Sequence, residues 1–340
     1  MKNILLFIFI SIFYANDFDE LYFGTDDALD IITWNIEWFP KNGNVTVDYV
    51  TQIIEAIDVD VIAMQELDDR NLFDQMLNEL NEYNGYYEST WFAGLAYIYN
   101  KNTVQINNIY EIFTTSPFWS PFPRSPMVMD MNFMNENYII INNHFKCCGD
   151  GVLDSNNSND EENRRLQAIT YLKEFLDDNF SNAKVVLLGD LNDDLSDTLE
   201  NNVFQFFIDD NENYQFVDMQ ISQGSSLNWS YPTWPSHLDH ILISNELFED
   251  FQNQNSLVSV IKIDEYMGGW NNYDSNVSDL RPIGIKLSHN KVNLNPDLIN
   301  YEKKYIKAVN ILGADLNNNY SGLIIQFFDD GSVEKKYIFK

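Results

Sequence analysis

Residues 185–193 read Val185-Val186-Leu187-Leu188-Gly189-Asp190-Leu191-Asn192-Asp193, and this stretch does most to decide the fold. Four consecutive apolar residues are typical of a strand that is buried on both faces. Asp190 and Asn192 follow this run two residues apart, so their side chains point to the same side of an extended chain. A buried strand that ends in polar residues predicts an α/β protein with a site where its strands meet loops.

The rest of the chain repeats this layout. Short apolar, β-rich runs lie at residues 31–34, 59–64, 97–99, 138–141 and 241–243. Helical patterns lie between them at residues 49–57, 69–80 and 161–178. Because strands and helices alternate, we expect sheets that are sandwiched by helices.

Acidic, amide and imidazole side chains lie at the ends of several of these runs. They are Asn35, Glu37, Glu66, His144, Asp190, Asn192, Asp239 and Asp279. Each has an ordinary structural explanation, because Asp and Asn cap helices and form turns, and a lone Glu after a strand is usually solvated. Together, carboxylates with Asn and His but no thiolates form the oxygen-rich environment that Mg²⁺, Mn²⁺ or Ca²⁺ prefers, and such ions accompany phosphate chemistry.

Six segments in order, WNIEWF (34–39), VIAMQE (61–66), NHFK (143–146), GDLND (189–193), HLDHIL (237–242) and SDLRP (278–282), resemble a known motif series. It is that of the endonuclease/exonuclease/phosphatase superfamily, the DNase I-like proteins. The resemblance implies a four-layered α/β sandwich over residues 28–288, in which two mixed β-sheets pack face to face and are flanked by helices. It also implies a phosphoesterase that uses Mg²⁺, or Mn²⁺ or Ca²⁺ in its place.

The resemblance also implies a role for each matching residue. Asn35 and Glu66 match the residues that hold the metal, with Glu37 as a supporting carboxylate and Asp279 beside them. His144 matches the histidine that contacts the scissile phosphate. Asp190 and Asn192 match the residues that orient the nucleophile or leaving group and bind the phosphoryl oxygens. Asp239 matches the acid that orients the last histidine of the family.

That last histidine is missing, because Leu280 stands where the family has Ser-Asp-His. Three explanations stay open: an impaired or non-catalytic descendant, replacement by another histidine, or a change peculiar to this sequence. His237 ranks above His240 and His289 as a replacement, since it lies two residues before Asp239 and would share its strand face. We predict substrate-binding roles for His237 and Arg124. The alternative for His237 is a plain surface position, and the alternative for Arg124 is a surface salt bridge.

The chain carries 52 Asp and Glu against 20 Lys and Arg, for a net charge of -32. This charge repels nucleic acid at long range and argues against tight, non-specific coating of DNA, but it does not exclude a nuclease whose metal ions hold the phosphate. Lys2 followed by the apolar run Ile4–Ile10 predicts a signal peptide over residues 1–16 and a secreted protein. The run is too short for a confident membrane span, so we expect no stable membrane insertion. We also expect the protein to be a monomer.

Two further features stand apart from the motif series. Residues 296–340 are β-rich, with Asp330-Gly331 predicting a hairpin turn, and their end resembles the C-terminal sorting domain of the type IX secretion system. Secretion machinery is therefore an expected partner. The adjacent Cys147 and Cys148 would close only a strained ring and are a weak zinc pattern, so we interpret them as a local loop clamp.

The leading hypothesis is a secreted, divalent-metal-dependent phosphoesterase, a nuclease that hydrolyses the phosphodiester bonds of extracellular nucleic acid. One alternative is a phosphatase or phospholipase-type esterase acting on lipid or sugar phosphates, because the same fold supports both. The other is a pseudoenzyme that binds metal or phosphate without turnover. Exposed aromatic residues near the site would favour the lipid alternative, and the candidates are Trp229, Tyr231, Trp234 and Trp270.

Overall fold

A computed structural model describes residues 18–87, 89, 92–288, 305–310, 313, 314, 316, 322–328 and 333–338. The predicted signal peptide and His289 lie outside the described residues. The chain divides into two compact units, Met1–Asn290 and Lys291–Lys340. The predicted spans 28–288 and 296–340 fall one in each unit.

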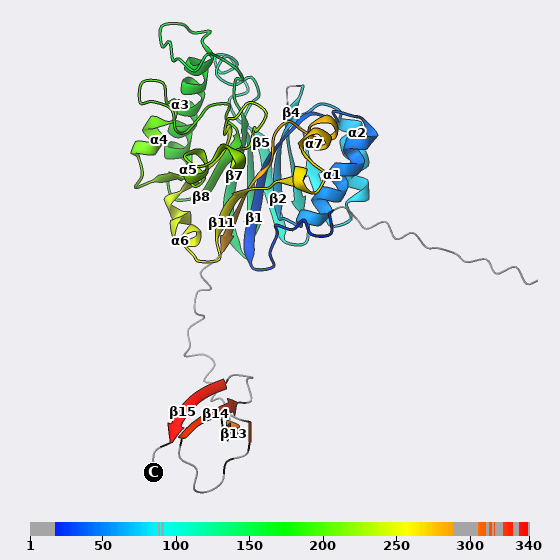
Figure 1. The fold of residues 1–340 in the computed structure, drawn as a ribbon. Helices are drawn as coiled ribbons and strands as arrows, with labels where there is room; N and C mark the ends of the chain where they lie inside the picture. The colour runs from blue at the N-terminus through cyan, green and yellow to red at the C-terminus, as the bar shows by residue number, and fades with distance from the viewer. Residues whose placement is uncertain are drawn as a thin grey trace, which may run out of the picture. The chain divides into compact units, whose positions relative to one another are not determined.

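The first unit contains two six-stranded sheets (Figure 1). In order, the first sheet consists of β11 (Leu257–Val260), β12 (Ile283–Ser288), β1 (Ala28–Phe39), β2 (Val61–Leu67), β4 (Gly94–Asn100) and β3 (Tyr83–Tyr86). The second consists of β5 (Val104–Glu111), β6 (Met127–Phe133), β7 (Glu136–His144), β8 (Lys184–Asp190), β10 (Asp239–Ser244) and β9 (Tyr214–Phe216). The pairs β1–β2 and β7–β8 are parallel and the other pairs are antiparallel, so both sheets are mixed, as predicted.

Helices cover the outer faces of the two sheets (Figure 1). On the side of the first sheet lie α1 (Asn44–Ile57), α2 (Arg70–Glu79) and α7 (Trp270–Asn276); on the side of the second lie α3 (Glu161–Asn179), α4 (Gln205–Asp209) and α5 (Met219–Ser222). The short α6 spans Phe248–Phe251, and 3₁₀ turns span Ser226–Asn228, Asn245–Leu247 and Ile263–Glu265. Among the described residues, none of these helices has the length and apolarity needed to cross a membrane.

Three buried apolar clusters correspond to the three interfaces of four layers. Ile31 belongs to the cluster between the sheets, whereas its neighbour Ile32 belongs to the cluster that packs under α1 and α2. The third cluster packs the second sheet against α3 and includes Ile139 and Leu172. Because side chains alternate along a strand, each central strand needs apolar residues on both faces. The predicted four-layered sandwich is confirmed.

The second unit holds one antiparallel sheet, in the order β13 (Tyr305–Asn310), β14 (Gly322–Phe328) and β15 (Val333–Ile338). The predicted small C-terminal β module is therefore confirmed. Asp330 and Gly331 lie outside the described residues, but the two strands that they join pair antiparallel, as a hairpin requires.

Candidate active site

The predicted site residues meet at one end of the two sheets. The parallel strands β1 and β2 carry Asn35 and Glu66 near their carboxyl ends, and β7 and β8 end at His144 and Asp190. Asp239 begins the antiparallel strand β10 and lies opposite Asp190. A cleft of about 740 Å³ opens at this end. The predicted residues that line it are Asn35, Glu37, Glu66, His144, Asp190, Asn192 and Asp279.

Asn35 joins the two sheets at the base of the cleft. Its Nδ2 donates to Asp190 Oδ2 of the second sheet at 2.8 Å and to Glu66 Oε1 of the first sheet at 3.3 Å. Its Oδ1 accepts the backbone N–H of Glu37 at 2.9 Å. Glu66 itself accepts the backbone N–H of Trp38 at 3.1 Å through Oε2. Two carboxylates from different sheets are thus directed at the same place.

Glu37 has a different set of partners from Glu66. Its Oε2 accepts a hydrogen bond from Lys41 Nζ and the backbone N–H of Asp279, the latter at 2.8 Å. The Lys41 ammonium offsets the Glu37 charge, so this carboxylate ties the end of β1 to the segment that carries Asp279. This position fits the supporting role expected for Glu37.

Among the described residues, no lysine or arginine forms an ion pair with Asp190, Asp239 or Asp279, whereas Arg165 pairs with the cleft residues Glu162 and Asp193. Burial, followed by the nearby Glu66, raises the pKa of Asp190 to about 6. Burial and Glu37 raise the pKa of Asp279 to about 7, and burial and Asp190 raise the pKa of Asp239 well above its usual range. Neither carboxylate oxygen of Asp239 has a hydrogen-bond partner, nor does Asp279 Oδ1.

A divalent cation fits this donor set. Unpartnered, buried carboxylate oxygens are costly unless a metal ion or a proton compensates them. The donors are carboxylate and amide oxygens, which are the ligands that Mg²⁺, Mn²⁺ and Ca²⁺ prefer. The residues placed to hold the ion are Asn35 and Glu66, with Asp190, Asp239 and Asp279 supplying further negative charge.

His144 lies beside these carboxylates in its neutral form. Its Nε2 lies 3.8 Å from Glu66 Oε1 and 3.7 Å from Asp190 Oδ2, and its Nδ1 has no partner. Burial, with a smaller effect of Arg124, lowers the pKa of His144 well below its usual range. A neutral imidazole next to carboxylates can donate a hydrogen bond to a phosphoryl oxygen without charge of its own.

Asn192 and Arg124 occupy different positions around the cleft. Asn192 adopts a left-handed conformation with φ 56°, donates its backbone N–H to Asp190 Oδ1 at 3.1 Å, and lines the cleft. Arg124 does not line it; its Nε donates to Ala93 O at 3.2 Å. Within the described part of the chain Arg124 makes no ion pair. Burial raises the pKa of Glu66 and lowers that of His144, and the Arg124 charge opposes the first shift and adds to the second.

Leu280 lies in the cleft wall where the family places a histidine. Its side chain is buried at 6% exposure, and its backbone oxygen accepts a hydrogen bond from Tyr273 Oη at 2.6 Å. Tyr273 Oη in turn accepts from Trp34 Nε1 at 3.0 Å, so the backbone here is firmly held. A leucine at this position can offer no hydrogen-bond donor to a carboxylate, and both oxygens of Asp239 lack a hydrogen-bond partner.

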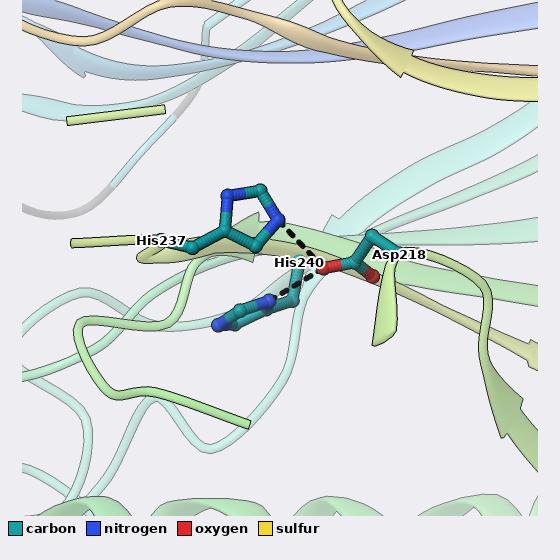
Figure 2. Close-up of side chains that lie close together, drawn as sticks. All are labelled: Asp218, His237 and His240. Atoms are coloured by element: carbon teal, nitrogen blue, oxygen red, sulfur yellow. Dashed lines mark hydrogen bonds and ion pairs between the residues drawn. The ribbon is translucent and has the colours of Figure 1, made fainter. Parts of the chain in front are cut away.

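The prediction that His237 shares the strand face of Asp239 and reaches substrate is wrong. β10 begins only at Asp239, so strand alternation does not extend back to residue 237. His237 is completely buried and points at Asp218, as does His240 (Figure 2). Nε2 of His237 lies 3.1 Å from Asp218 Oδ2, and Nδ1 of His240 lies 2.6 Å from the same oxygen. Neither histidine replaces the one missing at 280.

The hydrogen bonds of this cluster show which ring nitrogens of His237 and His240 carry protons. The backbone N–H of Ser230 points at His237 Nδ1 at 3.3 Å, so that nitrogen accepts and Nε2 carries the proton. His240 faces an acceptor on both sides, Asp218 and the carbonyl of Asp193 at 2.8 Å, and is therefore an imidazolium. Burial opposes this charge, but Asp218 raises the pKa of His240, and His240 lowers that of Asp218 although burial acts to raise it.

Among the described residues, two clusters bring three potential ligand atoms close together: Asp160, Glu161 and Glu162 before and at the start of α3, and Asp218, His237 and His240. In the second cluster both histidines contact Asp218. Their nitrogens are already occupied, because a metal on His237 Nε2 would leave both ring nitrogens without protons. We therefore assign this cluster a structural role. No sequence pattern pointed to Asp218, which lies nineteen residues before His237 and outside all six motif segments.

Comparison with known proteins agrees with this geometry. The sequence model of the Endonuclease/Exonuclease/phosphatase family matches residues 32–259. No curated protein shows significant sequence similarity to the chain. Among solved structures, D. rerio TDP2 complexed with single strand DNA product is similar at 14% identity, covering 77% of this chain and 99% of that one with a TM-score of 0.56.

Two further solved structures share the fold. The human Nocturnin catalytic domain with bound sulfate anion is 15% identical over 76% of this chain and 93% of its own, with a TM-score of 0.54. The endonuclease/exonuclease/phosphatase from Bacteroides vulgatus is 12% identical over 76% of this chain and 98% of its own, with a TM-score of 0.53. With the family model spanning more than half of the sequence and its motif residues gathered in one cleft, the chain belongs to the endonuclease/exonuclease/phosphatase family.

Proposed function

We propose that the chain is an exported, divalent-metal-dependent phosphodiester hydrolase that acts on nucleic acid. The observation that carries the proposal is the group of carboxylates Glu66, Asp190 and Asp279 that lines one cleft with Asn35 and His144, with the buried Asp239, whose oxygens have no hydrogen-bond partner, paired opposite Asp190 on the neighbouring strand. Such groups cost the folded protein stability unless a ligand or a proton compensates them, and their gathering in one cleft makes it a candidate binding site.

The metal and the side chains have separate tasks. A bound divalent cation would polarise a phosphoryl oxygen and stabilise charge on the leaving oxygen. Asn35 and Glu66 hold it, and Glu37 keeps the Asp279 segment in place through the backbone N–H of Asp279. His144 and Asn192 donate hydrogen bonds to the phosphoryl group, whose charge grows in the transition state.

Asp190 is the residue that can take the proton of the attacking water. Its pKa of about 6 lies near neutrality, as an efficient general base requires. The amide Nδ2 of Asn35 and the backbone N–H of Asn192 orient its carboxylate. Leu280 cannot share this task, and Asp239 has lost its partner, so we expect turnover at a reduced rate.

Aromatic side chains at the rim support a nucleobase-bearing substrate. Trp38, Tyr231 and Trp234 line the cleft, and Trp234 is 75% exposed. Phe92 packs beside Trp38 with ring centroids 6.0 Å apart. Stacking on such rings binds unpaired bases without the basic surface that this acidic chain lacks. Trp229 and Trp270, by contrast, are engaged by Ile221 O and by the guanidinium of Arg281.

The same rim favours one second candidate, an esterase that acts on a lipid phosphate. Trp38 and Trp234, which line the cleft, are 49% and 75% exposed, and apolar side chains of this kind can also contact a membrane surface. Leu280 motivates the inert alternative, a chain that binds metal without turnover.

The test is hydrolysis by the purified chain beginning at residue 17, with bis(p-nitrophenyl) phosphate, single-stranded and plasmid DNA, and phospholipid vesicles as substrates. We expect activity on bis(p-nitrophenyl) phosphate and on DNA that requires Mg²⁺ or Mn²⁺, is abolished by EDTA and is lost in Glu66→Ala. Glu55→Ala, at an exposed position of α1, is the matched control and should retain the activity. Cleavage of vesicles alone would select the lipid esterase, and silence with all substrates would select the inert chain.

Export rests on the sequence of both ends of the chain. Lys2 with the apolar run Ile4–Ile10 supports a leader, and the β-rich residues 296–340 support delivery by a type IX system. N-terminal sequencing of the exported protein should begin near residue 17. A reporter fused to residues 291–340, the whole second unit, should leave a bacterium that has this system and stay inside a mutant that lacks it.

A further inference from the structure

We propose that Cys147 and Cys148 form a reversible modification site, a vicinal disulfide that closes on the wall of the active-site cleft. Both side chains line this cleft and are exposed. The two sulfur atoms lie 2.9 Å apart, with the Cys148 thiol donating to Cys147 Sγ. The thiols of two adjacent residues usually diverge, so this approach requires a backbone that directs them together.

Arg165 supplies that constraint on the backbone. Its Nη1 donates to the carbonyls of Lys146 and Cys148, both at 2.8 Å, which lie on either side of Cys147. Its Nε donates to Asp193 Oδ2 at 2.7 Å, and its Nη2 lies 3.0 Å from Glu162 Oε1. Arg165 is 2% exposed, so the clamp is buried beneath the thiols.

The residues after the two cysteines are held as well. Cys148 adopts φ 69° and Gly149 φ 109°, and a Cβ at Gly149 would lie 2.2 Å from Glu162 Oε1. The backbone N–H of Gly151 donates to this same Glu162 oxygen at 2.8 Å. Because the loop is ordered before the ring closes, closure costs little further conformational entropy.

The charges around the thiols separate the attacking sulfur from the resolving one. Lys146 Nζ lies 3.7 Å from Cys147 Sγ and donates to Cys147 O at 2.8 Å, so an ammonium stands beside the sulfur that accepts the hydrogen bond of the Cys148 thiol. The hydrogen bond to Cys147 raises the pKa of Cys148, which keeps its proton longer. Cys147 is therefore the first nucleophile.

The oxidant is a small-molecule disulfide or a disulfide-bearing oxidoreductase of the exporting compartment. The Cys147 thiolate attacks one sulfur of that disulfide, forms a mixed disulfide and releases one thiol. Cys148 loses its proton and attacks Cys147 Sγ, which forms the Cys147–Cys148 bond and releases the second thiol. Two protein thiols are oxidised and one external disulfide is reduced to two thiols.

Intact-mass spectrometry of the chain from residue 17, incubated with oxidised glutathione, tests the proposal without an activity assay. We expect a monomer that has lost two hydrogens, carries no glutathione and resists alkylation by iodoacetamide until a phosphine reductant restores both thiols. Because no substrate is involved, failure of this result and failure of the proposed function are distinguishable.

Three variants keep the test sharp. Cys148→Ser should accumulate the glutathione adduct on Cys147, because the resolving thiol is absent. Cys147→Ser should react more slowly than Cys148→Ser, because Lys146 Nζ contacts Cys147 Sγ and the pKa of the Cys148 thiol is raised. Lys146→Gln should form the same internal disulfide as the unaltered chain, only more slowly. A stable glutathione adduct, a disulfide-linked dimer or two unreacted thiols in the unaltered chain would overturn the proposal.

Discussion

Asp239 and His240 are neighbours on β10, yet they belong to two opposite kinds of polar cluster. His240 is an imidazolium with a hydrogen-bond acceptor on each ring nitrogen, and its counter-ion Asp218 also accepts the backbone N–H of Ile241 at 3.0 Å. Asp239 is equally buried, but neither of its carboxylate oxygens has a partner. A buried charge with all its partners serves the fold, whereas one without partners is maintained for something that binds.

The same contrast separates the two groups of acidic residues as wholes. Around Asp218 one carboxylate is matched by one imidazolium, and a neutral histidine completes the arrangement. In the candidate site, Asp190, Asp239 and Asp279 form no ion pair with a lysine or arginine of the described residues, whereas Lys41 pairs with Glu37 and Arg165 pairs with Glu162 and Asp193. Substitutions in the two groups should therefore have effects of opposite sign.

The largest effect is expected from giving Asp239 a partner. Leu280→His places an imidazole where the family has one, so it should raise kcat for bis(p-nitrophenyl) phosphate by about 10²–10⁴-fold, the range for a general acid or base. Adding Asp239→Asn to this variant should remove most of the gain, because the amide cannot stabilise an imidazolium. Steady-state kinetics in Mg²⁺ measure both. An unchanged kcat in Leu280→His would mean that a histidine at position 280 does not act together with Asp239 in turnover.

Removing a partner from the satisfied cluster should cost stability instead. Asp218→Asn leaves the His240 charge buried without a counter-ion, so the free energy of unfolding should fall by about 3–5 kcal/mol. Asp239→Asn should do the reverse in metal-free buffer and raise the melting temperature at neutral pH, because folding no longer has to protonate this buried carboxyl, whose pKa is raised well above its usual range. Chemical and thermal unfolding measure the two changes. Asp48→Asn, on the exposed face of α1, is the control, and equal effects at 218 and 239 would erase the distinction drawn between them.

Metal should supply what the cleft lacks and leave the Asp218 cluster untouched. At a concentration of Mg²⁺ a hundred times its Kd, binding to the folded state alone adds about 2.7 kcal/mol of stability. Thermal shift in Mg²⁺ and in EDTA should show this difference in the unaltered chain and little of it in Glu66→Ala. If Asp218→Asn abolished the Mg²⁺ response while remaining folded, the metal would have to be reassigned to the histidine cluster.

A smaller effect is expected from pH in metal-free buffer. The carboxyls of Asp190 and Asp279, with pKa values of about 6 and about 7 against an ordinary 3.8, still bind protons that the unfolded chain has released. Stability should therefore fall as pH rises from about 4 to 7, since the unfolded state binds fewer protons over this window. Melting temperatures measured across that range should show the decline, and saturating Mg²⁺ should flatten it.

Part of that slope comes from elsewhere and should not respond to metal. Asp30 and Asp60 lie at the other end of β1 from the cleft, and burial raises their pKa values to about 7 and about 6. His240, whose pKa is also raised, adds stability below its unfolded pKa that is lost as pH rises. Asp30→Asn should reduce the slope equally with and without Mg²⁺. A pH dependence that Mg²⁺ leaves wholly unchanged would contradict the assignment of Asp190 and Asp279.

Much of the fold and the cleft could be predicted because both depend on short-range pattern. Apolar runs such as Val185–Leu188 identify strands buried on two faces, and the polar residues directly after them must lie at the sheet edge. Glu66 and Asp190 were found in this way. Only the family resemblance implied that these two residues share one site with residues from other strands.

What the sequence could not supply depended on loops. His237 lies in the segment before β10, where strand alternation does not hold, and its true partner Asp218 comes from a different loop. Arg165 lies on α3, and nothing in the helix pattern shows that it holds the Cys147–Cys148 loop and Asp193 together. Such contacts join segments far apart in the chain, and no periodicity records them.

The bond from Asn35 to Asp190 has one more consequence, since it crosses from one sheet to the other. A second crossing lies just behind it, where Gln65 Nε2 donates to Asn142 Oδ1 at 2.7 Å. The candidate site therefore lies at the interface between the two sheets, and neither sheet alone supplies all of its residues. Any slippage between the halves would dismantle the site before it unfolded the protein, so catalysis should fail earlier on heating than the sheets themselves.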